Sequence, residues 1–245
     1  MTEWWTYRLG SFLMFSPRTY GGLVERYNAE LWPLQPLLLA LGGLALASAW
    51  RARSSRTQGR WVWALLGAAW LWVGWAFHHQ RFAAINWAAE YVAWAFVAQG
   101  LALLWVGAVR GHLGFGRDVP AARVAGASIG AFALLGLPLL GVALGRPWAQ
   151  AESFGLMSDP TALATLGLLV LAQRPPWWLL IVPLLSCLLG GALASALQAP
   201  AAWLVPVLAG AAVAGVGWRR RAGSRLADTG SHREGRHRLA GPPMP

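Results

Sequence analysis

The chain has 245 residues, of which 57% are hydrophobic and only 12% are charged. Soluble domains carry about 25% charged residues, so this composition excludes an ordinary soluble protein. Apart from histidine, every basic residue is an arginine, and the absence of lysine excludes chemistry that needs a side-chain amine, such as a retinal Schiff base. The single cysteine, Cys187, excludes a disulfide within the chain and a cysteine-based zinc site.

The first 28 residues are mixed in character. Ser16 and Pro17 predict a helix start, because a serine hydroxyl caps a helix and proline suits the first helical position. The residues that follow include Arg18 and Glu25, and they carry too much charge for a membrane span. We therefore expect residues 1–28 to contain an amphipathic helix that lies at the outer membrane interface.

Seven apolar blocks follow between residues 29 and 218, each about as long as an α-helix that spans hydrocarbon. They are apolar on all sides, whereas a soluble core helix shows a polar stripe. The sequence thus predicts an all-α, polytopic transmembrane bundle. The fifth block is the weakest and leaves open a half-helix or re-entrant segment. The expected spans are Ala29–Trp50, Trp61–Phe77, Trp87–Val109, Ala122–Leu144, Phe154–Ala172, Trp178–Leu197 and Ala201–Trp218.

The distribution of charge predicts the orientation of these spans. With seven crossings and the amino terminus outside, the inner segments hold fifteen arginines and three acids, and the outer segments hold five arginines and six acids. Inner loops of bacterial membrane proteins carry the excess of basic residues. We therefore expect a bacterial inner-membrane protein with the amino terminus outside and the carboxyl terminus in the cytoplasm.

Residues 219–245 have little to bury, since arginine, glycine, serine, histidine and proline dominate there. We expect a disordered cytoplasmic tail whose arginines contact anionic lipid head groups. Topology accounts for this charge, so nucleic acid is not an expected partner. Whether the chain binds a membrane-protein partner or a second copy of itself stays open.

Small residues in the fourth span predict close helix packing. The pairs are Gly126 with Gly130 and Gly141 with Gly145, both with the spacing that brings helix backbones together. We favour packing within the bundle over a dimer face. Gly126–Gly130 also matches the G-x-S-x-G pattern of hydrolases, but that pattern needs a strand–turn–helix elbow with acid and histidine partners, so we reject it here.

Polar residues that are candidates for a binding site collect at the outer face. His78, His79 and Arg81 close the second span, and Asn86 and Glu90 open the third. Asn86 and Glu90 are four residues apart, which places them on one helix face. Two histidines and a carboxylate are ligand types for zinc, copper or nickel, which makes His78 and His79 candidate metal ligands. The favoured interpretation is a membrane boundary at which Glu90 pairs with Arg81.

A second outer cluster holds Arg146, Gln150 and Glu152, and it is followed by Asp159 and Pro160. Folded over the first cluster, this loop would form a polar vestibule, while an ordinary exposed loop is the alternative. Asp159 and Pro160 also resemble a plain helix start, with the aspartate as cap and the proline at the first position.

The hydrocarbon region contains few polar groups, and we expect these to form hydrogen bonds between helices. No acid lies at mid-depth, so a proton relay lacks its parts. No phosphate-binding loop or dinucleotide fingerprint occurs, and we expect no cofactor. The deep polar residues are Gln35, Gln99, Ser128, Ser186 and Cys187.

Four stretches of the chain resemble an uncharacterised bacterial membrane-protein family, a domain of unknown function whose members are sometimes labelled permeases. The resemblance covers most of the chain up to the tail, and it implies a multi-helix inner-membrane fold without an established activity. The stretches are Phe12–Tyr20, Leu31–Gln35, Ile85–Ala89 and Gly145–Glu152.

The leading functional hypothesis is a small-molecule or ion transporter, or an accessory subunit of one, with its entry at the outer vestibule. A non-catalytic membrane scaffold or sensor is the alternative, and a metal-dependent membrane enzyme, which would need His78, His79 and Glu90 to converge, is the third; enzymatic activity is the less favoured class. The expected ligand-binding residues are Glu90, Arg81, Asn86, Glu152, Gln150 and Arg146.

Overall fold

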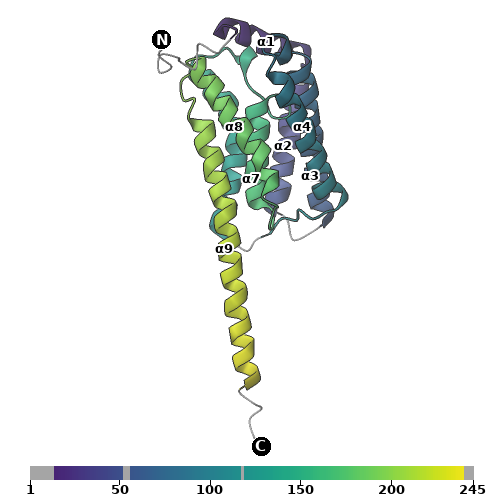
Figure 1. The fold of residues 1–245 in the computed structure, drawn as a ribbon, viewed down its shortest axis with the longest axis vertical. Coiled ribbons are helices and arrows are strands. Elements are labelled where there is room, and N and C mark those ends of the chain that lie inside the picture. The colour runs from purple at the N-terminus through teal and green to yellow at the C-terminus, as the bar shows by residue number, and fades with distance from the viewer. Residues whose placement is uncertain (1–13, 52–55, 117–118, 240–245) are drawn as a thin grey trace, which may run out of the picture.

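The computed structural model describes residues 14–51, 56–116 and 119–239, and it shows a bundle of helices that run along one long axis (Figure 1). Residues 1–13 of the expected interfacial segment and 240–245 of the expected tail lie outside the described residues. Within the described residues there is no β-strand; Phe115 and Ala172 form an isolated bridge. The all-helical class predicted from the sequence is confirmed.

One short helix, α1 (Pro17–Glu30), lies across one end of the bundle, here named the α1 end (Figure 1). It begins as predicted, with Pro17 in the first turn and the Ser16 hydroxyl accepting a hydrogen bond from the Thr19 N–H over 3.2 Å. The expected start of the first span at Ala29 is wrong. The helix continues to Glu30, and the chain turns before α2, because proline at position 33 opposes helical continuation.

Seven helical rods make up the bundle within the described residues, and several of them contain a π-helical stretch. Short 3₁₀ turns, η4 (Phe82–Ala84) and η7 (Trp148–Gln150), lie in the connections at the α1 end. The rods are α2 (Leu34–Arg51); α3 with η3 (Arg56–Trp72, Val73–His79); α4 with η5 (Ala89–Leu103, Leu104–Val109); α5, η6 and α6 (Pro120–Ala131, Phe132–Gly136, Leu137–Ala143); α7 (Ser158–Leu171); α8 (Trp178–Ala196); and α9 (Leu204–Leu239).

Four of these rods are long and apolar enough to cross a membrane, judged by length and composition over the described residues: α2, α4 with η5, α5 through α6, and α8. The helix α7 is apolar but shorter. This pattern suggests a membrane protein.

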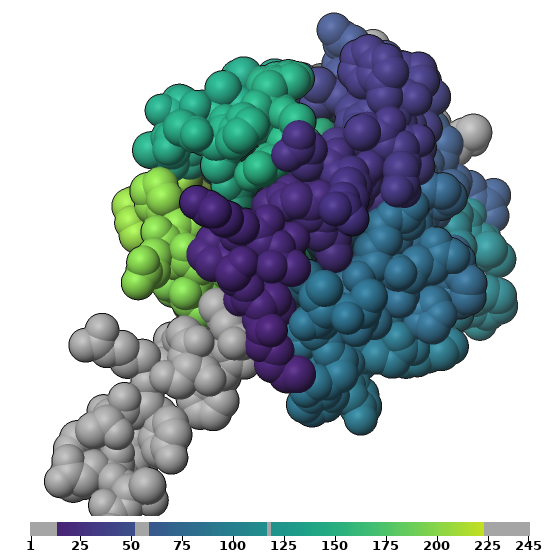
Figure 2. Space-filling model, turned by 90° about the horizontal axis from the view of Figure 1, so that it is seen from above, coloured from purple at the N-terminus to yellow at the C-terminus, as the bar shows by residue number. Residues whose placement is uncertain are grey.

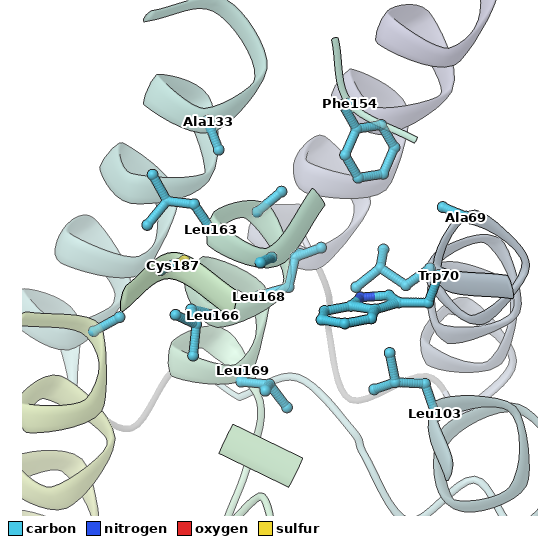
Figure 3. Packing of buried hydrophobic residues seen from close by; sticks show 14 of the residues in the cluster. Ala69, Trp70, Leu103, Ala133, Phe154, Leu163, Leu166, Leu168, Leu169 and Cys187 are labelled. Atoms are coloured by element: carbon cyan, nitrogen blue, oxygen red, sulfur yellow. The ribbon is translucent and has the colours of Figure 1, made fainter. Parts of the chain in front are cut away.

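The shortest rod, α7, is the centre of the bundle. Every residue from Pro160 to Leu171 is buried, although a helix of 14 residues reaches only about 21 Å. Figure 3 shows its leucines facing side chains of the surrounding helices, among them Trp70 of α3. The Trp70 indole N–H donates a hydrogen bond to the Thr165 hydroxyl over 2.8 Å, which fixes α3 against α7.

The backbones of α5 and α7 approach each other closely in the core. A methyl group on Gly167 would lie 2.7 Å from the Gly126 carbonyl oxygen and 2.7 Å from the Gly130 nitrogen. The two backbones therefore touch directly, and the prediction of within-bundle packing for Gly126 and Gly130 is confirmed. The parallel prediction for Gly141 and Gly145 is wrong, because α6 ends at Ala143 and Gly145 takes a positive φ of 92° in the turn that follows.

A charged side chain lies at each end of α7. Asp159 lies in its first turn, where the helix dipole favours an anion. At the other end Arg219 is only 4% exposed, and it donates hydrogen bonds to the carbonyls of Val170 (2.7 Å) and Gly116 (3.0 Å). Arginine at this position complements the negative end of the dipole.

The backbone of α9 is helical from Leu204 to Leu239, so it passes the expected boundary at Trp218 without a break. The first tail residue, Arg219, belongs to the buried part of the bundle, which explains why the helix does not stop where the apolar run stops. Beyond the bundle α9 extends away from the α1 end (Figure 1). The predicted division of the chain into an interfacial segment (1–28), a transmembrane bundle (29–218) and a tail (219–245) stays a prediction.

Replacing Gly167 with alanine tests the backbone contact between α5 and α7. The added methyl group has no room, since the atoms it meets are backbone, and overpacking of this kind costs about 1–3 kcal/mol. We expect a lower melting temperature for purified Gly167→Ala in detergent. Gly210→Ala in α9 is the control, because nothing lies within 4 Å of its added carbon; equal melting temperatures for the two variants would contradict the contact.

Candidate functional site

A cavity of about 290 Å³ lies near the α1 end of the bundle, and its walls come from α1, η3, α4, α7 and α8. Its polar side is formed by residues from both outer clusters and from α1. The side toward α4 and α8 is apolar apart from Ser186 of α8. The polar lining residues are Tyr20, His78, Asn86, Arg146, Glu152, Ser158, Asp159 and Ser186.

The segment between α6 and α7 carries Arg146 and Glu152, and Asn28 of α1 holds it in place. Asn28 is 8% exposed, and its side-chain amide donates two hydrogen bonds, to the carbonyls of Ala149 (2.8 Å) and Ala151 (2.9 Å). Figure 2 shows α1 lying across this end of the molecule. The helix therefore both covers the cavity and fixes the loop that supplies its charges.

Arg146 and Glu152 form an ion pair, with 2.8 Å between Nη1 and Oε1. Burial alone would lower the pKa of Arg146, but the Glu152 carboxylate more than offsets this and the pKa lies above its ordinary value. The pKa of Tyr20 lies well above its ordinary value. Burial is the largest cause, and the nearby carboxylates of Glu152 and Asp159 raise the pKa further. Tyr20 therefore stays a neutral hydroxyl that can donate a hydrogen bond.

Asp159 occupies a position that the helix-start pattern does not predict. The helix begins at Ser158 with Met157 as its cap residue, so Asp159 lies inside the first turn rather than at the cap. Its carboxylate lies directly against the backbone of α8 at Gly190, where a β-carbon would collide with it. The prediction of Asp159 as cap is wrong, because the chain already turns into the helix from Ser153, whose carbonyl accepts the Met157 N–H over 3.0 Å.

His78 of η3 also lines the cavity, and its Nε2 and the Ser158 hydroxyl are 2.7 Å apart. The side chain is 4% exposed, and its other nitrogen, Nδ1, has no hydrogen-bond partner. Phe96 packs on the imidazole, with ring centroids 4.7 Å apart. The histidine thus joins η3 to the start of α7 through a single hydrogen bond.

His79 and Glu90 face away from this cavity. His79 Nδ1 lies 2.7 Å from Glu90 Oε2, and both side chains are 38% exposed. Trp75 stacks on the His79 ring at 4.6 Å between centroids. Neither His79 nor Glu90 lines the cavity.

Arg81 pairs with Glu30 rather than with Glu90, with 2.6 Å between Nη2 and Oε2. The expected pair of Arg81 and Glu90 is therefore wrong, since α1 brings Glu30 to the guanidinium and His79 takes Glu90. Arg81 also lies over the Tyr27 ring at 4.7 Å. Arg81 and Glu30 both line a separate hollow of about 580 Å³ between α1 and η4.

Asn86 and Glu90 do not share a helix face, because α4 begins only at Ala89. The Asn86 side-chain carbonyl accepts a hydrogen bond from the Ala88 N–H over 3.2 Å, and the residue lines the cavity. Gln150 lies against α1, where its amide oxygen would be 3.0 Å from a β-carbon on Gly21. Of the expected ligand-binding residues, the structure thus brings Asn86, Arg146 and Glu152 together.

The two histidines point to different partners, so the structure does not bring His78, His79 and Glu90 together. Among the residues that the structure describes, no group of three or more histidine, cysteine, aspartate or glutamate side chains is placed to hold a metal ion. Sequence reasoning missed Tyr20 and Asn28, for which the chain offers no local signal. The helix α7 itself was predicted by the fifth apolar block, Phe154–Ala172.

The fold and the cavity define an all-helical protein that suits a membrane, with a charged cavity at one end. A family model described as "Family of unknown function (DUF6064)" matches residues 20–226. The chain therefore belongs to this family, as the resemblance in the sequence indicates. No curated protein and no solved structure matches it.

Replacing Asn28 with aspartate tests the link between α1 and the loop. The variant loses both donated hydrogen bonds and places a carboxylate against two carbonyl oxygens, which costs about 2–3 kcal/mol. We expect a lower melting temperature in detergent. Asn86→Asp is the matched control, because Asn86 uses its oxygen as acceptor and aspartate keeps that oxygen; an equal loss in both variants would contradict the role given to Asn28.

Proposed function

We propose that this protein crosses the inner membrane of a bacterium seven times, with the α1 end outside and the far end of α9 in the cytoplasm. Large apolar side chains stand exposed along the outer surface of the bundle, among them Leu44, Leu135 and Ile181. In water such a surface would be unfavourable, whereas in lipid it is matched by acyl chains.

Tryptophan and arginine support this placement. Exposed tryptophans lie near both ends of the rods, as interfacial residues do: Trp32, Trp75, Trp87, Trp148 and Trp203 toward the α1 end, and Trp50, Trp61, Trp105, Trp177 and Trp218 toward the other. At that second end arginines lie over three of these rings, Arg123 over Trp50, Arg110 over Trp105 and Arg220 over Trp177.

The short helix α7 fits a seven-crossing arrangement because lipid need not touch it. Its length of about 21 Å is less than the ~30 Å of a hydrocarbon core. Every residue from Pro160 to Leu171 is enclosed by other helices. Non-helical backbone next to a short helix is tolerated at membrane depth where protein surrounds it.

Single cysteines at the two ends test this orientation. Ala149→Cys lies at the α1 end and Arg174→Cys at the other, and both positions are exposed. With a membrane-impermeant maleimide on intact inner-membrane spheroplasts, we expect Ala149→Cys to be labelled and Arg174→Cys to be labelled only after the membrane is opened. The native Cys187 is fully buried, so the parent protein serves as background. The reverse labelling pattern would contradict the proposed orientation.

The function that the cavity supports best is uptake of a small molecule from the outer side, as in a permease-like transporter. One observation carries it: a cavity of about 290 Å³, with charged side chains of the 145–159 segment in its wall, lies at the start of a helix that does not reach the α1 end. Interrupted or short helices whose amino termini face a substrate site are a feature of secondary transporters. The volume is close to the lower limit of about 300 Å³ for ligand pockets, which favours a small ligand.

A sensor that binds a ligand without moving it is the second candidate. It is favoured by the burial of α7 below the cavity, because a helix enclosed from Pro160 to Leu171 closes the path toward the cytoplasmic end. A transporter requires that this helix or its neighbours move.

A thermal-stability screen of small molecules on the protein in lipid nanodiscs tests the site. We expect a compound that raises the melting temperature of the wild type and of Glu90→Gln, which lies outside the cavity, but not of Glu152→Gln, which loses the ion pair with Arg146. Uptake of that compound into proteoliposomes then separates a transporter from a sensor. A compound equally effective on all three proteins would place binding elsewhere.

A further inference from the structure

The charged side chains of the cavity do not balance. Arg146, Glu152 and Asp159 line it, and Arg146 is paired with Glu152 over 2.8 Å. That pair leaves the Asp159 carboxylate, whose one formal negative charge the positive end of the α7 dipole offsets only in part. An unbalanced charge in surroundings of low polarity costs free energy unless a counter-charge or a proton joins it.

The Asp159 carboxylate is available to such a partner. It has no hydrogen bond to another side chain among the described residues, and it lies between the cavity and the α8 backbone at Gly190. The same three charged residues line a smaller cavity of about 100 Å³ between α6, α8 and α9. The carboxylate therefore stands at the wall of two cavities rather than in packed protein.

The other lining residues of the cavity indicate the shape and polarity of a ligand that fits it. The side formed by α4 and α8 is mainly apolar, with Val92 on one helix and Leu189 and Leu193 on the other. Beside α4 lies His78, buried at 4% exposure and without a partner for Nδ1. A ligand that fits has a compact apolar body and one polar head that donates hydrogen bonds.

We infer that the cavity binds a small monocationic amine, whose ammonium group pairs with Asp159 while its apolar body lies between α4 and α8. This inference rests on the proposed function and names the class of its ligand. Tyr20 of α1 lines the same cavity and adds a polar hydroxyl to the site. Because Glu152 neutralises Arg146, this arginine does not draw anions into the cavity.

Three compounds with one apolar body and different heads test this assignment: cyclohexylamine, cyclohexanol and cyclohexanecarboxylate. Binding to the protein in nanodiscs is measured by titration calorimetry and by the shift in melting temperature. We expect the amine to bind about tenfold more tightly than the alcohol, the factor that separates a charge-assisted hydrogen bond from a neutral one. The carboxylate should bind least well.

Variants show whether Asp159 causes the preference. Asp159→Asn keeps the shape of the side chain, and we expect it to lose the tenfold preference for the amine. Glu90→Gln is the matched control, since it also removes one carboxylate near the α1 end but lies outside the cavity; it should keep the preference. In Asp159→Asn with Glu152→Gln only Arg146 remains charged, and the preference should change to the carboxylate.

The outcomes separate this inference from the proposed function. Equal affinity for amine and alcohol, or an amine preference that survives in the double variant, overturns the ammonium site. If a different compound from the stability screen depends on Glu152 while the amine does not bind, the inference fails and the proposed function stands. If no compound binds in a way that depends on the cavity residues, both fail.

Discussion

The burial of one short helix, α7, governs the arrangement of this protein. A helix end leaves backbone N–H and carbonyl groups without intrahelical partners, and in an apolar interior each of these costs free energy unless it is satisfied. Charged side chains lie at both ends: Asp159 lies in the first turn, where the helix dipole favours an anion, and Arg219 donates a hydrogen bond to the Val170 carbonyl in the last turn. Both residues are therefore constrained by a helix that makes no contact with the surroundings of the bundle.

The cavity is a consequence of the same constraint. Because α7 stops short of the α1 end, the space above it must be filled by the segment between α6 and α7, and that segment carries Arg146 and Glu152. The only regular secondary structure described in this segment is the short turn η7. Asn28 of α1 holds the segment by donating two hydrogen bonds to it. The cavity lies between this loop, α4 and α8.

The sequence predicted what local rules control. Ser16 and Pro17 mark the start of α1, and hydrophobic length marks the rods, because capping and burial act within one segment. Pairings across the chain were not predictable. Glu30 meets Arg81, 51 positions away, and Asn28 meets the carbonyls of Ala149 and Ala151 across 121 and 123 positions. Such contacts depend on where α1 lies, and no periodicity encodes that placement.

Arginine has two functions at the end opposite α1, and they are difficult to separate in the sequence. A count of charges treats Arg219 and Arg220 as signals of orientation, since basic residues are retained on the cytoplasmic side. In the structure Arg219 caps α7 from within the bundle, and Arg220 lies over Trp177 at 4.7 Å. Arg219 and Arg220 thus contact the central helix and Trp177, and the same two charges count toward the predicted orientation. A substitution at Arg219 that tests orientation alone is consequently not available, because it also removes a partner of α7.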